Sequence, residues 1–386
     1  MHSQLVTSAD RKPFLDVNGD FPGESPVGAR ASKDAYQEDE VYLQVAKSKN
    51  KDLVLGRLHN LRRPDDHPFV IAKRPHKTKP EILINEAAVM TYLQGDDHFS
   101  KIIDLVQVQG ALLLLMEPVD GYDLSKIRSK ISMPVDFKIE IMRQVAVGLA
   151  QLHRQGIVHN DIKLTNIMLD TKGSVKIIDF GIASIADPDG KHLHTGSTPG
   201  YAAPEQVLEQ ADLIDDKTDV YAWGQACLRL LGNLTNDDVA SVLELAGKSS
   251  EEVHISLNQN NSDLLRHTQE MYRSRQVDRL VRFIELCLSI DPEARPTAQR
   301  CVEVLGHIIP SLGNPDLKSL ARAQIRPLRQ TESTAINLEF ETEEHLARPI
   351  HRIPRNQFSV HRIGSPSRHT QMGYTTATRT RLARAI

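Results

Sequence analysis

“HNDIKLTNIMLD”, residues 159–170, places Asp161, Lys163 and Asn166 directly before a short apolar run. A second apolar run, “SVKIIDF”, follows after the polar turn “TKG”. Two short β-branched runs joined by a glycine-containing turn are typical of a tight hairpin. This hairpin is expected to return Asp179 towards the loop that holds Asp161 and Asn166, so that two carboxylates and an amide converge.

The converging side chains suit phosphoryl transfer. Carboxylate and amide oxygens are ligands that Mg²⁺ prefers, and a carboxylate can also orient an attacking hydroxyl. Lys163 can neutralise charge on the transferred group. A glycosidase also uses paired carboxylates, but its mechanism has no need for a lysine between them.

Upstream of this loop, the runs “VYLQVAKS”, “DLVLGRLHN” and “PFVIAKR” predict three antiparallel strands, the third of which ends near Lys73. Thr78 and Pro80 then favour the start of a helix. Its predicted apolar face includes Glu86, and a buried carboxylate is costly unless a cation pairs with it. Lys73 is the nearby candidate.

The run “ALLLLMEPVDGYDL” predicts another buried strand, which Pro118 and Gly121 interrupt as a hinge. An amphipathic helix is expected over 134–155. Because strands come first and helices later, the sequence predicts an α+β fold with a small antiparallel sheet lobe, containing one key helix, and a larger, mainly helical lobe.

Seven motifs now stand in a fixed order: “IAK” ending at Lys73, Glu86, “HNDIKLTN”, “DFG” at 179–181, “APE” at 203–205, “DVYAWG” from Asp219 and “DPEARPT” from Asp291. Together they resemble the signatures of protein kinases, over residues 41–310. The resemblance implies a bilobal kinase domain, with an N-lobe over 41–118 and a C-lobe over 119–310. It also implies that Arg295 pairs with Glu205. “TPGYAAPEQ” resembles the matching segment of bacterial Ser/Thr kinases, and Lys163 favours Ser/Thr over tyrosine specificity by the same resemblance.

The resemblance also implies the roles of individual residues. Asp161 is the expected catalytic base, with Lys163 at the γ-phosphate of ATP, and Asn166 and Asp179 are the expected ligands of Mg²⁺, with Mn²⁺ as a substitute. The expected nucleotide-binding residues are Lys73, Glu86, Glu117, Val119, Asp123 and Met168. Met116 is either a gatekeeper or a core residue, Asp123 meets the ribose or caps a helix, and His159 is expected to be structural.

Two departures from the family pattern stand out. Asn160 replaces the usual arginine before Asp161, so the chain lacks the guanidinium that would bind a phosphate on the activation segment, 179–205. We therefore expect packing to hold this segment, without any need to modify Ser184, Thr195 or Ser197. Gly56 is the only glycine over 31–73, where a glycine-rich loop would cover the phosphates. Lysines at 47, 49 and 51 are the candidate substitutes, and weak ATP affinity is one expected consequence.

The two ends of the chain differ from its middle. Residues 1–40 carry eight acidic and four basic residues and are expected to be flexible. Residues 311–386 are expected to be a largely disordered basic tail, since 345–386 holds eight arginines and no acidic residue. Such a tail is either a solvated end or a docking arm for an acidic partner or an anionic membrane.

Composition excludes several classes of protein. The net charge of −3 gives no reason to expect specific binding to nucleic acid, and the three cysteines lack the spacing of a zinc site or a disulfide framework. No apolar run reaches about 18 residues, and the start lacks a secretory signal, so we expect a cytoplasmic protein. Delivery into a host cell as a bacterial effector is a hypothesis from “TPGYAAPEQ” and the missing leader.

The sequence leaves three functions to compare. Beside a Ser/Thr protein kinase that phosphorylates protein hydroxyls, the alternatives are a small-molecule kinase and a kinase-like scaffold.

Overall fold

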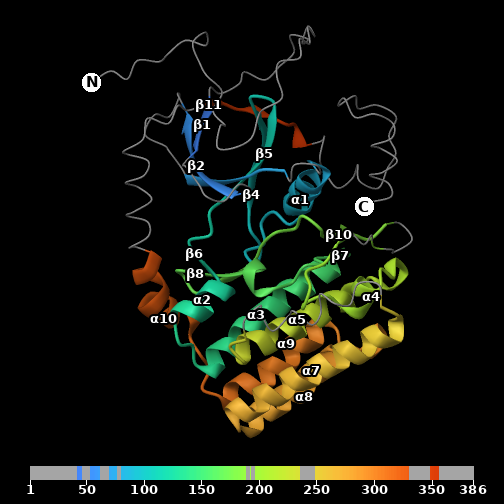
Figure 1. Ribbon diagram of the computed structural model, residues 1–386. Helices are drawn as coiled ribbons and strands as arrows, with labels where there is room; N and C mark the ends of the chain where they lie inside the picture. The colour runs from blue at the N-terminus through green and yellow to red at the C-terminus, as the bar shows by residue number, and fades with distance from the viewer. Residues whose placement is uncertain are drawn as a thin grey trace. The chain divides into compact units, whose positions relative to one another are not determined.

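Figure 1 shows the computed structural model of the chain. The structure describes residues 41–45, 53–60, 69–75, 80–187, 192, 196–234, 248–329 and 348–355. The acidic head, the lysines at 47, 49 and 51, Thr78 and Thr195 therefore lie outside the described residues, as does most of the basic tail.

Five strands form the core of an antiparallel sheet: β1 (Val41–Val45), β2 (Leu53–Asn60), β3 (Phe69–Lys73), β4 (Ile102–Val108) and β5 (Ala111–Met116). Their order in the sheet is β1-β2-β3-β5-β4. β4 and β5 meet at a two-residue turn in which Gln109 and Gly110 both have positive φ, 51° and 82°. Positive φ at both positions is the requirement of the type I′ hairpin turn, which matches the twist of the sheet.

The helix α1 (Pro80–Tyr92) packs against β4 and β5. Its inner face buries Leu83, Glu86 and the four residues 87–90. The predicted helix with a carboxylate on its apolar face is therefore present.

The chain then passes through β6 (Gly121–Asp123), α2 (Leu124–Lys130) and α3 (Val135–Arg154). Short strands follow: β7 (Ile157–Val158), β8 (Ile167–Asp170), β9 (Val175–Ile177) and β10 (Ser184–Ile185). β8 and β9 form the predicted hairpin around Gly173, whose φ is 84°. The interruption after β5 separates the sheet from the helical region, as predicted.

The helical region is built from α4 (Pro204–Val207), α5 (Asp216–Leu231), α7 (Ser250–Tyr272), α8 (Arg275–Cys287) and α9 (Ala298–Ile308). The short turns η2 (Ala211–Leu213) and η4 (Pro292–Ala294) connect α4 to α5 and α8 to α9, and η5 (Ile309–Ser311) follows α9. A further short turn, η1 (Leu164–Asn166), lies between β7 and β8. α5 is buried along nearly its whole length and contacts α3, α7, α8 and α9. The three cysteines are free and buried in this core. Within the described ranges, no helix has both the length and the apolar character needed to cross a bilayer.

The described part of the tail corrects one expectation. Residues beyond 310 form α10 (Leu317–Leu320), the π-helical turn η6 (Ala321–Ile325), β11 (Arg348–Pro349) and β12 (His351–Arg352). Leu317, Leu320, Ala321 and Ile325 are all buried in the main core. The expectation of a largely disordered tail from 311 is therefore wrong for these residues, because spacings of three, four and eight residues place their side chains on one helical face.

Candidate active site

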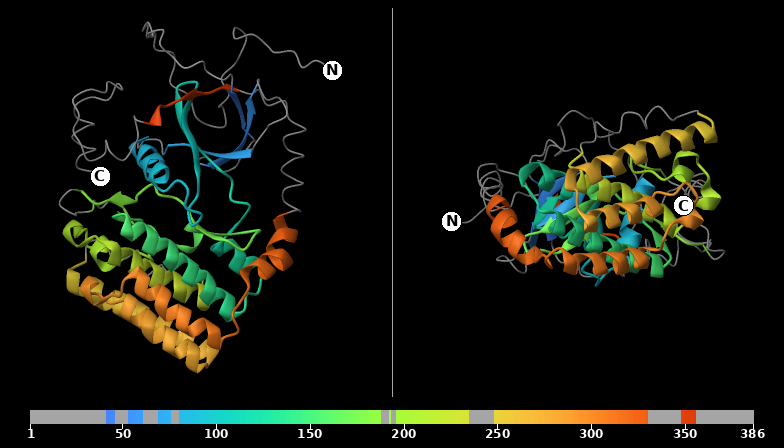
Figure 2. Two further views of the ribbon diagram at one scale, coloured as in Figure 1. Left: turned by 180° about the vertical axis from the view of Figure 1, so that it is seen from behind. Right: turned by 90° about the horizontal axis from the view of Figure 1, so that it is seen from below.

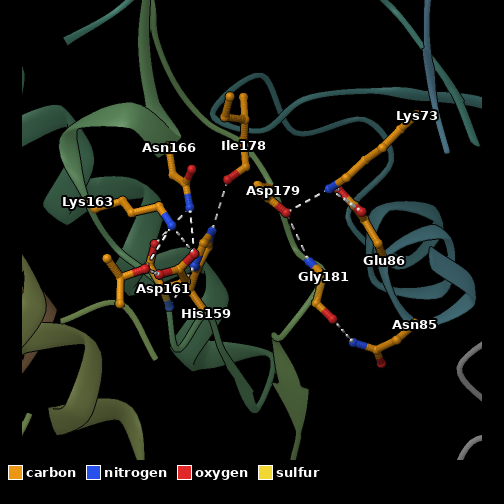
Figure 3. A network of polar contacts seen from close by, with 11 residues as sticks. Lys73, Asn85, Glu86, His159, Asp161, Lys163, Asn166, Ile178, Asp179 and Gly181 are labelled. Atoms are coloured by element: carbon orange, nitrogen blue, oxygen red, sulfur yellow. Dashed lines mark hydrogen bonds and ion pairs between the residues drawn. The ribbon is translucent and has the colours of Figure 1, made fainter. Parts of the chain in front are cut away.

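Lys73 lies between two carboxylates. Its ammonium Nζ is 2.7 Å and 2.9 Å from the two oxygens of Glu86, and 2.8 Å from Oδ1 of Asp179. These residues come from β3, α1 and the segment after β9, which are far apart in the sequence (Figure 3). The predicted Lys73–Glu86 pair is present, and the structure adds Asp179 as a second partner of the same lysine.

Burial and charge act in opposite directions on this cluster. Burial raises the pKa of Glu86 to about 7, although the neighbouring Lys73 opposes the rise. Burial would lower the pKa of Lys73, but the charges of Glu86 and Asp179 outweigh it and raise that pKa. Burial also opposes ionisation of Asp179, yet Lys73 holds its pKa below the usual range. Lys73 is therefore a cation at neutral pH, and the protonation of Glu86 is the variable in the cluster.

Asp161 is the centre of a second group of contacts. Lys163 Nζ lies 2.6 Å from Asp161 Oδ2, and Thr198 Oγ1 lies 2.5 Å from Oδ1. Asn166 Nδ2 donates to both Oδ2 and the backbone carbonyl of Asp161, at 3.0 Å each. The amide oxygen of Asn166 is thus turned away from this carboxylate, as a metal ligand requires. Figure 3 shows the two groups of contacts, with Asp179 between Lys73 and the loop of Asp161.

Asp219 accepts hydrogen bonds from the backbone of the loop that carries Asp161. Its two carboxylate oxygens accept from the backbone N–H groups of His159 and Asn160, each at 2.8 Å, and His153 Nε2 lies 2.9 Å from Oδ2. Asp219 is completely buried at the start of α5. The sequence motifs included “DVYAWG” but gave its first residue, Asp219, no role of its own. The position of Asp219 at the head of that motif was the available signal.

Asn160 joins the loop to the activation segment. Its φ is 65°, a left-handed conformation that asparagine tolerates better than most residues. Its Nδ2 donates to the Ile182 carbonyl at 3.1 Å and to Ser184 Oγ at 3.0 Å. Ser184 Oγ also lies 3.1 Å from Nδ1 of His192. Neutral hydrogen bonds therefore occupy the place where the family pattern has an arginine.

No modification of Ser184 is expected to be needed, and the structure adds that its side chain is buried. Its side chain is only 2% exposed, and its hydroxyl lies within hydrogen-bond distance of Asn160 Nδ2 and His192 Nδ1. A kinase cannot reach this hydroxyl unless the segment moves away from these partners. Ser197, in contrast, is exposed.

Aromatic packing connects the remaining parts. Phe180 is buried, with its ring centroid 5.1 Å from that of His159 and 5.8 Å from that of Phe99. His159 Nε2 lies 3.2 Å from the Ile178 carbonyl, in keeping with the structural role expected for this histidine. On the far side of the segment, Arg295 forms a buried, two-bond pair with Glu205, at 2.7 Å and 2.8 Å, as the resemblance implied.

The expected nucleotide-binding residues lie on the strands around the hinge. The Glu117 N–H donates to the Lys101 carbonyl, and the Val119 carbonyl accepts from Gly121, both at 2.9 Å. Among the residues that the structure describes, no backbone hydrogen bond involves the Glu117 carbonyl or the Val119 N–H. Met168 pairs in register with Asp123, whose carboxylate caps α2 by accepting from Lys126 N at 2.9 Å. The cap is thus observed for Asp123, and its contact with ribose stays a prediction, as do the nucleotide contacts of the other residues.

The metal-binding prediction rests on few donors. Among the residues that the structure describes, no group of three or more His, Cys, Asp or Glu side chains could hold an ion without further ligands. Asn166 and Asp179 supply oxygen donors of the kind that Mg²⁺ prefers, and Mg²⁺ usually takes its remaining ligands from substrate phosphates and water. The donor set therefore fits a Mg²⁺ ion that arrives with a nucleotide.

Comparisons with known proteins agree with this geometry. Residues 69–305 match the family model described as “Protein kinase domain”, a domain that in general uses ATP and a divalent metal. The chain is 31% identical over 202 residues to the LRR receptor-like serine/threonine-protein kinase FEI 2 of Arabidopsis thaliana. The aligned region covers 50% of this chain and 34% of that protein. The chain is 27% identical over 251 residues to the serine/threonine-protein kinase CLA4 of Eremothecium gossypii, with 62% and 29% covered.

A third relative is the mitosis inhibitor protein kinase wee1 of Schizosaccharomyces pombe, 27% identical over 223 residues, with 56% of this chain and 25% of that protein covered. The chain spans about a third or less of the length of these relatives. They come from a plant and two fungi, and they do not support the hypothesis of a bacterial effector.

Proposed function

Because this chain belongs to the protein kinase domain family, we propose that it is an ATP-dependent Ser/Thr protein kinase, which transfers the γ-phosphate to hydroxyl groups of proteins. The observation that carries the proposal is the position of Lys73, bonded at once to Glu86 on α1 and to Asp179. A scaffold without catalysis has no need to hold a cation between two carboxylates, at the cost of burying Glu86, whose side chain is 1% exposed.

In the proposed reaction, Asp161 accepts a hydrogen bond from the acceptor hydroxyl and orients it for attack. Lys163, whose Nζ lies 2.6 Å from Asp161, would stabilise charge on the transferred group. Lys73 binds the α- and β-phosphates of ATP, and Glu86 fixes the direction of its side chain. The Mg²⁺ held by Asn166 and Asp179 would neutralise charge on the phosphates.

We further infer that activity does not depend on phosphorylation of the activation segment. Neutral bonds from Asn160 to Ile182 and Ser184 support this, since they require no incoming charge. The Gln206 side chain adds a bond of 2.9 Å to the Asn160 carbonyl from the far end of the segment. Weak ATP affinity remains a separate proposal, because the loop that lacks glycines lies outside the described residues.

The test is to incubate the purified chain with labelled ATP, Mg²⁺ and a generic protein acceptor. We expect label on Ser or Thr of the acceptor, and a loss of at least about a hundredfold with Asp161→Ala or Lys73→Met. Transfer to a small molecule in place of protein would favour the alternative small-molecule kinase. ATP binding without transfer, equal in wild type and Asp161→Ala, would contradict the proposal and favour a scaffold.

A further inference from the structure

A short segment near the end of the described chain, residues 348–355, reaches both edges of the N-terminal sheet. β11 pairs with β1, where Arg348 is opposite Leu43, and β12 pairs with β4, where Arg352 is opposite Val106. At about 3.3 Å per residue, the four steps from Arg348 to Arg352 span roughly 13 Å. The sheet must therefore curl until its edges lie within that reach, and the left view of Figure 2 shows the segment, in red, running across the end of the sheet.

Two isoleucines of this segment pack on opposite faces of the sheet. Ile350 packs against the cluster of Leu43, Val70, Ala72, Val106, Leu113 and Leu115. Ile353 is 6% exposed and belongs to the larger cluster, which contains Leu105 and the inner face of α1. The Ile353 N–H also donates to the Leu105 carbonyl at 2.9 Å. The segment therefore contributes to the core of the sheet on both sides.

Polar contacts fix the position of the segment along β4. Arg352 Nε lies 3.2 Å from Asp104 Oδ2, and Arg355 donates to Gln94 Oε1 at 2.8 Å, just beyond the end of α1. Arg352 is 67% exposed, and exposed ion pairs contribute little to stability. The isoleucines and the strand pairing are therefore expected to provide most of the binding.

These contacts adjoin the element that carries Glu86. α1 packs on β4 and β5, and the segment covers the free edge of β4 and contacts Gln94, two residues beyond the C-terminal end of α1. We propose that residues 348–355 are a positioning segment, which holds α1 where Glu86 reaches Lys73, so that release of the segment lowers phosphoryl transfer. This proposal rests on the proposed function.

The experiment uses the full chain with Ile350→Asp and Ile353→Asp together, which places charges on two apolar contacts. Ile255→Asp is the matched control, because that isoleucine lies on α7 and is 61% exposed. Hydrogen exchange is measured over α1 and β4 and, for reference, over α8 and α9. A synthetic peptide of residues 345–358 is then added to the double variant, beside a peptide that carries the same two aspartates.

We expect faster exchange in α1 and β4, unchanged exchange in α8 and α9, and a fall in the rate of transfer of about tenfold or more. The natural peptide should restore both slow exchange and transfer, and the aspartate peptide should restore neither. A variant that unfolds as a whole would also lose activity, but the peptide would not rescue it, and this result would overturn the proposal. Unchanged exchange in α1 would do so as well.

The exchange arm separates this proposal from the proposed function. If the wild-type chain transfers no phosphate, the proposed function fails. The response of α1 to the variants and to the peptide then still decides whether the segment positions α1.

Discussion

Glu86 is a carboxylate on the apolar face of a helix, and a single ammonium offsets the cost of its burial. The structure shows why this position is sensitive: Lys73 is shared with Asp179, so Glu86 competes for its cation. Breaking a buried pair by removing one partner typically costs about 3–5 kcal/mol. Protonation of Glu86 is a milder form of the same loss.

This gives a prediction of pH dependence. Burial raises the pKa of Glu86 to about 7, and only the ionised form can hold Lys73 by charge. The rate of transfer should therefore fall as pH decreases through about 7, and Glu86→Gln should lower the rate and remove this limb. The measurement is kcat/KM for ATP between pH 5.5 and 8.5.

The free energy of unfolding should change with pH in the opposite direction to the rate of transfer. This difference separates loss of catalysis from loss of the fold. A carboxyl whose pKa is raised on folding favours the folded state more at low pH, and its contribution is lost as pH rises through about 7. Asp179 and Asp219 have lowered pKa values, so their contributions are lost only below the usual carboxylate range. The free energy of unfolding measured in urea should thus be no lower at pH 6 than at pH 8. If the rate and the stability fall together, unfolding explains the pH limb and our assignment to Glu86 is wrong.

The Asn160–Ser184 contact predicts different effects for two serines. Ser184→Ala leaves the buried amide of Asn160 with one partner fewer, at a cost of about 1–3 kcal/mol in stability, and should slow transfer. Ser197→Ala changes an exposed position, so its stability and its rate of transfer should equal those of the wild type within experimental error. Urea unfolding and rates of transfer measure the two effects.

Acidic replacements complete this test. Ser197→Glu should not activate the enzyme, since Asn160 carries no charge to receive it. A rate that falls a hundredfold in Ser197→Ala and recovers in Ser197→Glu would show that another cation binds a phosphate there.

At the scale of elements, the sequence predicted what local patterns determine. The α1 helix and the β8–β9 hairpin follow from spacings within about fifteen residues, and the structure contains both. β11 and β12 have two residues each, and their partners lie some 250–300 residues earlier, so no local period could indicate them. The left-handed φ of Asp179, 68°, is another feature that no local pattern of the sequence indicates.

The hairpin and α10 make a contact that glycine permits. A Cβ on Gly173 would lie 2.6 Å from the backbone of Leu317 and Lys318, whereas a Cβ on Gly110 would meet nothing within 4 Å. Their φ angles are nearly equal, 84° and 82°, so alanine at either position brings the same strain of about 1–2 kcal/mol. Gly110→Ala is therefore a control for backbone strain alone.

We predict that Gly173→Ala destabilises the fold by about 1–3 kcal/mol more than Gly110→Ala, because the backbone of α10 must move. Urea unfolding of both variants measures the difference. Hydrogen exchange in α10 should rise in Gly173→Ala and stay unchanged in Gly110→Ala. Equal unfolding curves would show that α10 is not held against this turn.

At the scale of the whole molecule, the described residues after 310 contact the rest of the chain in two groups, 317–329 and 348–355. Besides the positioning segment on the sheet, Arg326 Nε donates to the Thr171 carbonyl at 3.1 Å, and Arg329 lies 3.1 Å from Asp120, just after the hinge strand β5. Figure 1 shows α10 beside β6 and β8. Residues that a boundary at 310 would exclude therefore contact the segments before β6 and after β8.

Truncation gives the last prediction. A chain ending at 310 loses the buried side chains of Leu317, Leu320 and Ile325, each of which contributes about 1.5–3 kcal/mol as an upper estimate. That sum is comparable to the 5–15 kcal/mol that holds a typical domain folded. We expect this truncated chain to aggregate or to unfold at markedly lower urea, whereas a chain ending at 355 should match the full chain in its urea midpoint and rate of transfer. Because 356–386 are absent from both truncated chains, their comparison isolates 311–355. A chain ending at 310 that is as stable as the full chain would show that α10, η6 and the positioning segment contribute nothing to folding.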